Sequence, residues 1–180
     1  DRYEFITHDI KKISLGIIGY GRVGRKVKKY AKFFGIKTLY CDKLLDKKNY
    51  KKKFYNLVSN VDIISINANV IDKKKIIDTK EIKMMKKNAI IVNTSRSSLV
   101  NEDAIAKAIL SKNLFGYATD VISNERDIKK LKNSKLFKLS KNGYNVLITP
   151  HIGGCTYESI NKAEFLITKY FVDSNKIINL

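Results

Sequence analysis

The stretch from Leu15 to Asp42 decides the fold, and it reads LGIIGYGRVGRKVKKYAKFFGIKTLYCD. Within it, Gly19, Gly21 and Gly24 form a G-x-G-x-x-G pattern directly after an apolar run of strand length. A helical pattern of apolar residues follows, and a second short apolar run ends on the acidic Asp42. Three glycines alone say little, but inside a strand–turn–helix–strand unit that closes on a carboxylate they predict a dinucleotide-binding unit.

Each glycine of this pattern has its own predicted role. Gly19 adopts the backbone angles of a tight turn, which a Cβ atom would resist. Gly21 leaves room where a pyrophosphate approaches the main chain, and Gly24 lets the helix lie against the strand. The free N–H groups at the start of the helix, at Arg22 and Val23, face the phosphates together with the positive end of the helix dipole.

Asp42 predicts which dinucleotide binds. At the end of the second strand, its carboxylate is placed to accept hydrogen bonds from both hydroxyls of an adenosine ribose. A carboxylate there repels a 2′-phosphate, so NAD is favoured over NADP. The alternative is a glycine-rich turn in an α/β protein that binds nothing.

The rest of the chain repeats the alternation of strand and helix. Further apolar runs of strand length lack a polar–apolar alternation, which is typical of strands buried on both faces of a parallel sheet. We therefore predict an α/β fold of the Rossmann type, in which helices cover both faces of a doubly wound parallel sheet to give three layers. The further strands are expected at 61–66, 89–92, 115–121 and 146–149, the helices at about 50–58, 79–87, 101–112 and 156–173, and a polar loop with one short helix at 123–144.

The length and composition bound the class of protein. The 180 residues favour a single dinucleotide-binding domain over 1–180, with its core at about 13–175. There is no run of 18 apolar residues and no basic-then-apolar leader, so we expect neither a membrane span nor a signal peptide. Cys41 and Cys155 have no metal-ligand spacing, which predicts no metal site and favours free thiols in a reducing cytoplasm. The first residue is Asp and not Met, which indicates a fragment.

The net charge of +19 suggests a nucleic-acid partner. The composition argues against one, because only 5 of the 36 basic residues are Arg and the chain is also rich in Ile (25) and Asn (16). Lys, Asn and Ile all have AT-rich codons. The lysines at 51–53 also fall between apolar residues at helical spacing, on the predicted wet face of a helix. We expect no nucleic-acid role and no membrane role.

Three reactive side chains follow predicted strand ends. Arg96 comes after the 89–92 strand in NTSR, Glu125 lies past the strand that ends near Asp120, and His151 follows Pro150 in TPHIGG. All three are expected at the same edge of the sheet, where ligands of doubly wound folds bind. Taken singly, each has an ordinary alternative as a surface or turn residue.

The chain resembles the NAD-binding domain of the D-isomer-specific 2-hydroxyacid dehydrogenases, and most of all the D-3-phosphoglycerate dehydrogenase branch. The resemblance spans about residues 13–160, and the matching stretches are LGIIGYGRVG, DIISIN, MMKKNAIIVNTSR, LVNEDAIAKAIL, FGYATDV and LITPHIGG. It implies an NAD-dependent oxidoreductase that transfers a hydride between nicotinamide and a small D-2-hydroxy acid. It also implies a homodimer, and a substrate domain built mostly from N-terminal residues that this chain lacks.

The resemblance also implies the roles of individual residues. Arg96 grips the substrate carboxylate and carbonyl, Glu125 orients the catalytic histidine, and His151 is the acid/base. Asp120 contacts the nicotinamide amide. Thr94 and Gly153, in the same matching runs, are further cofactor contacts.

Three departures from the family pattern stand out. Ser97 replaces the usual glycine after the arginine, Arg126 replaces the usual proline after the glutamate, and Asn67-Ala68-Asn69 replaces H-x-P. Two alternatives to the dehydrogenase therefore remain, namely an NAD-binding corepressor-like regulatory protein and a decayed enzyme. The charge alone supports a third rival, a nucleic-acid binder.

Overall fold

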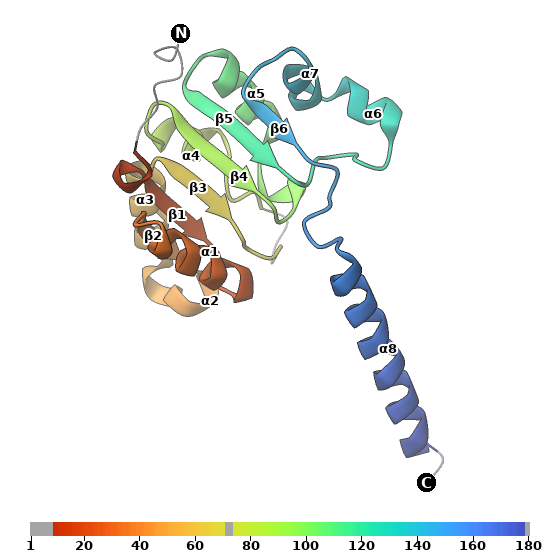
Figure 1. Ribbon diagram of the computed structural model, residues 1–180. Helices are drawn as coiled ribbons and strands as arrows, with labels where there is room; N and C mark the ends of the chain where they lie inside the picture. The colour runs from red at the N-terminus through yellow and green to blue at the C-terminus, as the bar shows by residue number, and fades with distance from the viewer. Residues whose placement is uncertain (1–8, 71–73, 179–180) are drawn as a thin grey trace. The chain divides into compact units, whose positions relative to one another are not determined.

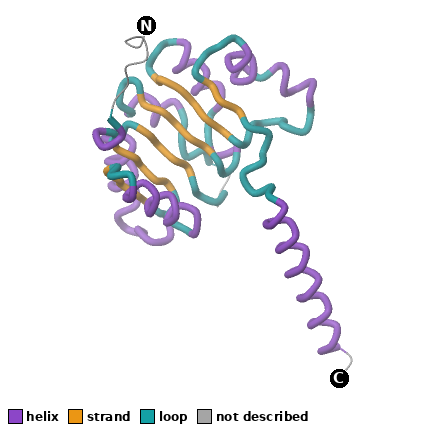
Figure 2. The backbone as a smooth tube through the Cα atoms, in the orientation of Figure 1, coloured by secondary structure: helices purple, strands orange, loops and turns teal. Residues whose placement is uncertain are grey.

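Six parallel strands form the centre of the molecule. The computed structural model describes residues 9–70 and 74–178 (Figures 1 and 2). Its sheet has the order β2-β1-β3-β4-β5-β6, and every neighbouring pair is parallel. The strands are β1 (Ser14–Ile18), β2 (Lys37–Cys41), β3 (Ile63–Ile66), β4 (Ala89–Asn93), β5 (Leu114–Thr119) and β6 (Val146–Ile148). The predicted doubly wound parallel sheet is confirmed.

The strand order reverses at β1. This strand pairs with β2 on one side and with β3 on the other, so the chain crosses over β1 on its way from β2 to β3. In open α/β sheets such a reversal leaves a crevice beyond the carboxyl ends of the two strands. The crevice is the expected place for a ligand.

Helices cover the two faces of the sheet. Helix α1 (Arg22–Phe33) lies on the face of Ile17, and α3 (Tyr50–Asn60) lies on the opposite face, where Leu57 and Val61 contact Gly16. Figure 1 shows α4 (Thr79–Met84) and α5 (Glu102–Leu110) on the same side of the sheet as α3. The three predicted layers are therefore present.

The core lies mainly between the sheet and the layer of α3, α4 and α5. Parallel strands contribute Ile64, Ile66, Ile91 and Tyr117, all nearly inaccessible to solvent. The lysines at 51–53 on α3 are exposed, as the helical spacing predicts. Cys41 is buried and Cys155 is exposed, and both are free thiols, as predicted.

The polar stretch at 123–144 differs from the expected loop with one short helix. It forms two helices, α6 (Ile128–Asn133) and α7 (Lys135–Lys141). Each begins at its own cap, since the Asp127 carboxylate accepts a hydrogen bond from Lys130 N and the Ser134 hydroxyl accepts one from Phe137 N. Another short helix, α2 (Lys43–Asp46), follows β2 and was not predicted.

The chain divides into two compact units after Pro150. The first contains the sheet, and the second contains the 22-residue helix α8 (Tyr157–Ile178), which is exposed over 157–173. The expectation of one domain over 1–180 stays a prediction. Among the described residues, no helix is both long and apolar enough to cross a membrane.

Candidate dinucleotide-binding site

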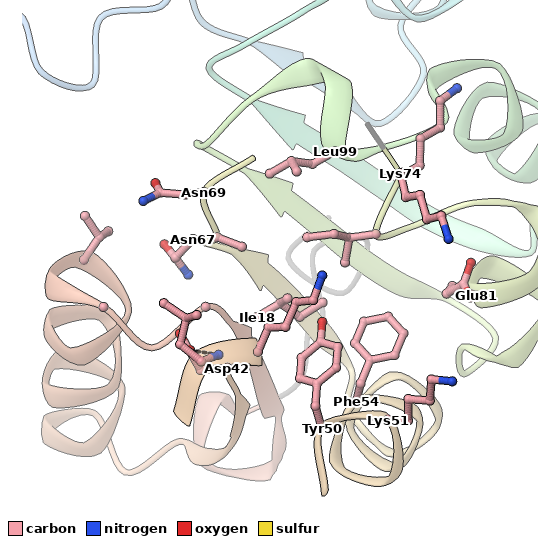
Figure 3. Close-up of a pocket in the computed structure, with 18 of the residues that line it drawn as sticks. Ile18, Asp42, Tyr50, Lys51, Phe54, Asn67, Asn69, Lys74, Glu81 and Leu99 are labelled. Carbon is pink, nitrogen blue, oxygen red and sulfur yellow. Dashed lines mark hydrogen bonds between the residues drawn. The ribbon is translucent and has the colours of Figure 1, made fainter. Parts of the chain in front are cut away.

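A cavity of about 480 Å³ opens where the strand order reverses. Its walls come from the segments that follow three strands, namely Gly19 and 21–23 after β1, 42–44 after β2 and 67–69 after β3, with further residues from α3 and α4. Figure 3 shows Asp42 and Asn67 on the side of the glycine-rich loop, and Tyr50 and Phe54 on α3. The volume lies in the range of small-molecule and cofactor sites.

Gly19 and Gly24 are required by the backbone, as the sequence predicts. Gly19 has φ +90°, and a Cβ there would lie 2.6 Å from Ala68 N. A Cβ on Gly24 would lie 2.1 Å from the carbonyl oxygen of Gly19. The first glycine therefore makes the turn after β1, and the second lets α1 approach the strand closely.

Gly21 differs, because a Cβ there would meet nothing within 4 Å. It is the N-cap of α1 and offers no side-chain cap, so the N–H groups of the first turn are left for another acceptor. The empty space lies in the wall of the cavity, next to Arg22 and Val23. This arrangement fits a pyrophosphate held against the main chain at a helix N-terminus.

The Asp42 carboxylate lines the cavity and also holds local structure. One oxygen accepts a hydrogen bond from Tyr20 N (2.7 Å), which ties the glycine-rich loop to the end of β2. The other accepts from Leu44 N (2.9 Å) and Leu45 N (3.2 Å) and caps α2. The sequence predicted a position facing the ribose but not these bonds.

The remaining lining combines positive charge with aromatic surface. Tyr50, Phe54 and Tyr55 come from α3, so part of the wall suits a flat, apolar ring. Five basic and two acidic side chains border the space, a balance that favours an anion: Arg22, Lys43, Lys51, Lys74 and Lys75 against Asp42 and Glu81.

A pair of tyrosines supports the glycine-rich loop from β2. The rings of Tyr20 and Tyr40 stack with centroids 3.9 Å apart, and the Lys28 ammonium lies 4.4 Å from the centroid of the Tyr40 ring. Tyr20 lies inside the glycine pattern, so its stacking and its backbone bond to Asp42 act on the same loop. Sequence analysis missed this support, because only the pairing of β1 with β2 brings these tyrosines together.

Two candidate residues follow β4, outside the cavity. Thr94 and Arg96 lie directly after this strand, and both are exposed. The Arg96 guanidinium donates a hydrogen bond to the carbonyl oxygen of Ser95 (2.7 Å).

Asp120 lies at the end of the neighbouring strand β5 and is nearly buried. Its main-chain N–H donates to the carbonyl oxygen of Asn93 (3.1 Å), and the Thr149 hydroxyl donates to its carboxylate (2.5 Å). The structure therefore brings the ends of β4 and β5 together at one edge of the sheet.

Glu125 lies on the loop that follows β5. It is half-buried, and its carboxylate accepts a hydrogen bond from Ile122 N (3.4 Å). The same loop is held by Glu102 of α5, whose carboxylate accepts from Ser123 N (2.9 Å). Burial raises the pKa of Glu102 above its usual range, although the bonds from Ser123 act in the opposite direction. From the sequence, Glu102 was assigned only to the helix predicted at about 101–112.

His151 and Gly153 belong to the second unit, where both are exposed. His151 has φ +56°, in the left-handed region that few residues other than glycine adopt. Residues in such conformations cluster at functional sites, where the surrounding structure holds them. The backbone of His151 is therefore unusual, as a functional role would allow.

The run Asn67-Ala68-Asn69, which replaces the family's H-x-P, is anchored to β1. Asn67 donates from its main-chain N–H to Ile18 O (2.7 Å) and from its side chain to the Ser65 hydroxyl (3.0 Å). The residue after β3 is therefore held to β1.

Within residues 9–70 and 74–178, no group of three or more His, Cys, Asp or Glu side chains is arranged to hold a metal ion.

The fold and the cavity define a dinucleotide-binding domain of the doubly wound class. The family model for the D-isomer specific 2-hydroxyacid dehydrogenase, NAD binding domain, matches residues 1–153. The chain belongs to this family, and NAD is the cofactor of its domain.

Individual relatives agree with the family. The chain is 33% identical to a glyoxylate reductase of Thermococcus litoralis, over 93% of this chain and 50% of that protein. It is 36% identical to a putative 2-hydroxyacid dehydrogenase of Staphylococcus haemolyticus, over 86% of this chain and 48% of that protein. It thus spans about half the length of these curated relatives.

A solved structure shows the same fold. The D-lactate dehydrogenase of Aquifex aeolicus, complexed with NAD and lactic acid, superimposes with a TM-score of 0.79 at 27% identity. The match covers 95% of this chain and 56% of that one.

Proposed function

We propose that the protein containing this chain is an NAD-dependent oxidoreductase that interconverts a small D-2-hydroxy acid and its 2-keto acid. The observation that carries the proposal is the position of Arg96 and Glu125 beyond the ends of the paired strands β4 and β5, in a chain of this family. Within the family pattern, His151 is the third member of this set. The nicotinamide, when bound, supplies or accepts the hydride.

The cofactor is held by the cavity at the strand reversal. Gly21 and the first turn of α1 bind the pyrophosphate, and Asp42 binds the adenosine ribose. The aromatic side chains of α3 offer a surface for the adenine ring. Thr94, Asp120 and Gly153 contact the nicotinamide end.

The substrate is bound and protonated by the chain's own side chains. The Arg96 guanidinium binds the planar carboxylate with two parallel hydrogen bonds and polarises the adjacent carbonyl. During reduction, the His151 imidazolium gives its proton to the carbonyl oxygen, and during oxidation the imidazole takes the hydroxyl proton. Within the family pattern, the Glu125 carboxylate orients the imidazole.

Steady-state kinetics of the full-length protein test this proposal. His151→Ala is expected to lower kcat for 2-keto acid reduction at least about a hundredfold, as loss of a general acid does. Arg96→Ala is expected chiefly to raise KM, because the guanidinium also holds the substrate in the ground state. Glu125→Gln is expected to lower kcat with little change in NADH affinity, since the imidazole loses the carboxylate that orients it. Near-full activity of His151→Ala on every substrate of the parent would refute the assignment.

We propose 3-phosphoglycerate as a candidate substrate, because the motifs resemble most closely that branch of the family. The kinetic assays therefore use several 2-keto acids: the 2-keto acid of 3-phosphoglycerate, glyoxylate and pyruvate. NADH binding without turnover of any member would instead support the regulatory protein or the decayed enzyme.

A homodimer is part of the proposal. The C-terminal end of α1 carries three exposed aromatic side chains, Tyr30, Phe33 and Phe34, the second of them 85% exposed. Exposed apolar groups of this kind are typical of interaction surfaces. Sedimentation of the full-length protein tests it: a dimer that Phe33→Glu dissociates is expected, and a monomer would refute it.

We also infer that the protein works in the cytoplasm, as the free thiols of Cys41 and Cys155 suggest. Fractionation of the cells that produce the protein is the test, and recovery outside the cytoplasmic fraction would contradict the inference.

A further inference from the structure

The amide side chain of Asn93 holds the loop that carries Arg96. Asn93 is the last residue of β4 and is completely buried. Its Oδ1 accepts a hydrogen bond from Ser95 N (3.0 Å), and its Nδ2 donates to the carbonyl oxygen of Arg96 (2.9 Å). The Tyr117 hydroxyl lies 3.4 Å from the same Nδ2. Both ends of one amide thus hold the backbone on either side of the Ser95–Arg96 peptide.

These bonds fix the start of the 94–99 segment, in which Thr94, Arg96 and Ser98 are exposed. The carbonyl oxygen of Arg96 accepts from Leu99 N (3.2 Å) as well as from Asn93, so the backbone of Arg96 is held from two directions. The Arg96 side chain itself is exposed. Its guanidinium donates to the carbonyl oxygen of Ser95 (2.7 Å), so the side chain is tied to the same stretch of backbone that Asn93 holds.

Asn93 also joins this loop to the neighbouring strand. Its carbonyl oxygen accepts a hydrogen bond from Asp120 N (3.1 Å) and lies 3.0 Å from the Thr119 hydroxyl. Asn93 thus links the Arg96 loop to the end of β5, the strand that leads to Glu125.

A purely space-filling role does not account for this side chain. Burial of an amide costs free energy unless its hydrogen bonds are satisfied, and an apolar residue fills a core position without that cost. The hydrogen bonds of the Asn93 side chain go to the backbone of the Arg96 loop and to the Tyr117 hydroxyl.

We propose that Asn93 is a positioning residue for Arg96, and that it sets the direction of the guanidinium toward a substrate carboxylate. The catalytic half of this inference rests on the proposed dehydrogenase function. The structural half, that Asn93 orders the 94–99 loop, does not.

A double-mutant cycle tests the catalytic half in the full-length protein. Asn93→Leu keeps the approximate size of the side chain and removes its bonds to the loop. It is expected to raise KM for the 2-keto acid at least about tenfold and to leave NADH affinity within about twofold. In an Arg96→Ala background, the same change is expected to alter kcat/KM by less than about twofold, because the group it acts through is gone. Tyr117→Phe, the matched control, removes the hydroxyl and leaves both loop bonds, so it is expected to have little effect.

Independent effects of the two substitutions would overturn the catalytic half. Should Asn93→Leu lose NADH binding through misfolding, Asn93→Asp is taken through the same cycle. Asp keeps the acceptor for Ser95 N and loses the amide donor to Arg96.

Hydrogen exchange tests the structural half without any turnover. In Asn93→Leu, or in Asn93→Asp if that variant replaces it, the amides of residues 94–99 are expected to exchange at least about tenfold faster, while those of α1 stay unchanged. Unchanged exchange at 94–99 overturns the inference. If the parent protein reduces no 2-keto acid, the proposed function fails and the exchange result alone decides whether Asn93 orders the loop.

Discussion

At the scale of single residues, each of the three glycines of the motif is required for a different physical reason. A Cβ on Gly24 would overlap a carbonyl oxygen at 2.1 Å, and Gly19 needs a positive φ, whereas Gly21 has open space beside it. The first two requirements come from the fold, so substitution there is expected to cost stability. The third comes from the cavity, so substitution there is expected to cost binding.

Asp42 is predicted to discriminate between the two nicotinamide dinucleotides. Its carboxylate lines the cavity, and a 2′-phosphate would meet its negative charge. We expect NADH to bind at least about tenfold tighter than NADPH, and Asp42→Asn to narrow that ratio because it removes the charge. Fluorescence titration with both cofactors measures this.

Glu81→Gln is the matched control for Asp42→Asn. Glu81 lines the same cavity from α4 and has no assigned contact with the ribose. Loss of its charge is therefore expected to leave the ratio of NADH to NADPH affinity unchanged. Equal affinity of the parent protein for both cofactors would remove Asp42 from the assigned role.

The roles of the glycines were predictable from the sequence because they are backbone requirements of one local motif. The second role of Asp42 was not, since the cap that it forms belongs to a helix of only four residues, too short to show periodicity. Asn93 was placed only directly after the strand predicted at 89–92, with no role of its own. Its importance depends on two hydrogen bonds that form only after the loop folds back.

At the scale of elements, Asp62 joins three segments at the amino end of the sheet. It lies just before β3, accepts hydrogen bonds from the Ser14 main-chain N–H (2.8 Å) and hydroxyl (2.5 Å) at the start of β1, and pairs with Lys86 beyond α4 (2.9 Å). Burial on its own would raise the pKa of Asp62, but the bonds from Ser14 and Lys86 outweigh it and lower the pKa to about 2.

This lowered pKa predicts a loss of stability in acid. A carboxyl group with a depressed pKa in the folded state stabilises the fold above its unfolded pKa of about 4. That contribution is lost as the pH falls from about 4 to about 2. Asp62→Asn is expected to lower the free energy of unfolding by about 1 kcal/mol at pH 7, a modest value because the pair with Lys86 is partly exposed.

Urea unfolding at pH 7 and at pH 2.5 measures this effect. The difference between parent and Asp62→Asn is expected to shrink at the lower pH. A difference of the same size at both values would show that the carboxylate charge plays no part.

The inner strands β1, β3, β4 and β5 were predictable because each is a largely apolar run between turn residues, as burial on both faces of a parallel sheet requires. The edge strands β2 and β6 are less buried, and their short apolar stretches beside the glycine motif and before Pro150 indicated them. Helices α6 and α7 were not predictable, because the stretch that holds them is polar. Their ends depend on the caps at Asp127 and Ser134, and six or seven residues give too few turns for a clear apolar stripe.

At the scale of the whole molecule, the charge of +19 calls for an explanation. The lysines of α3 at 51–53 are exposed, and Lys53 pairs with Asp46. Lys51, Lys74 and Lys75 line the cavity, so part of the excess faces the predicted anionic cofactor. Sequence composition alone did not distinguish these lysines from the solvated ones.

Binding to random duplex DNA is expected to be weak and to disappear steeply with added salt, as nonspecific phosphate contacts do. A fluorescence anisotropy titration at low and physiological salt measures it. Submicromolar affinity at physiological salt would instead support a nucleic-acid role.

The central claim is that NAD binds where the strand order reverses, and a titration of Gly21→Leu with NADH tests it most directly. The parent protein is expected to bind NADH saturably. The variant is expected to lose at least about a hundredfold in affinity, because its side chain fills the space kept for the pyrophosphate, and to keep its thermal midpoint within about 2 °C. Gly24→Ala, by contrast, is expected to lower the midpoint. Undiminished NADH binding by Gly21→Leu, or no binding by the parent protein, would contradict the account.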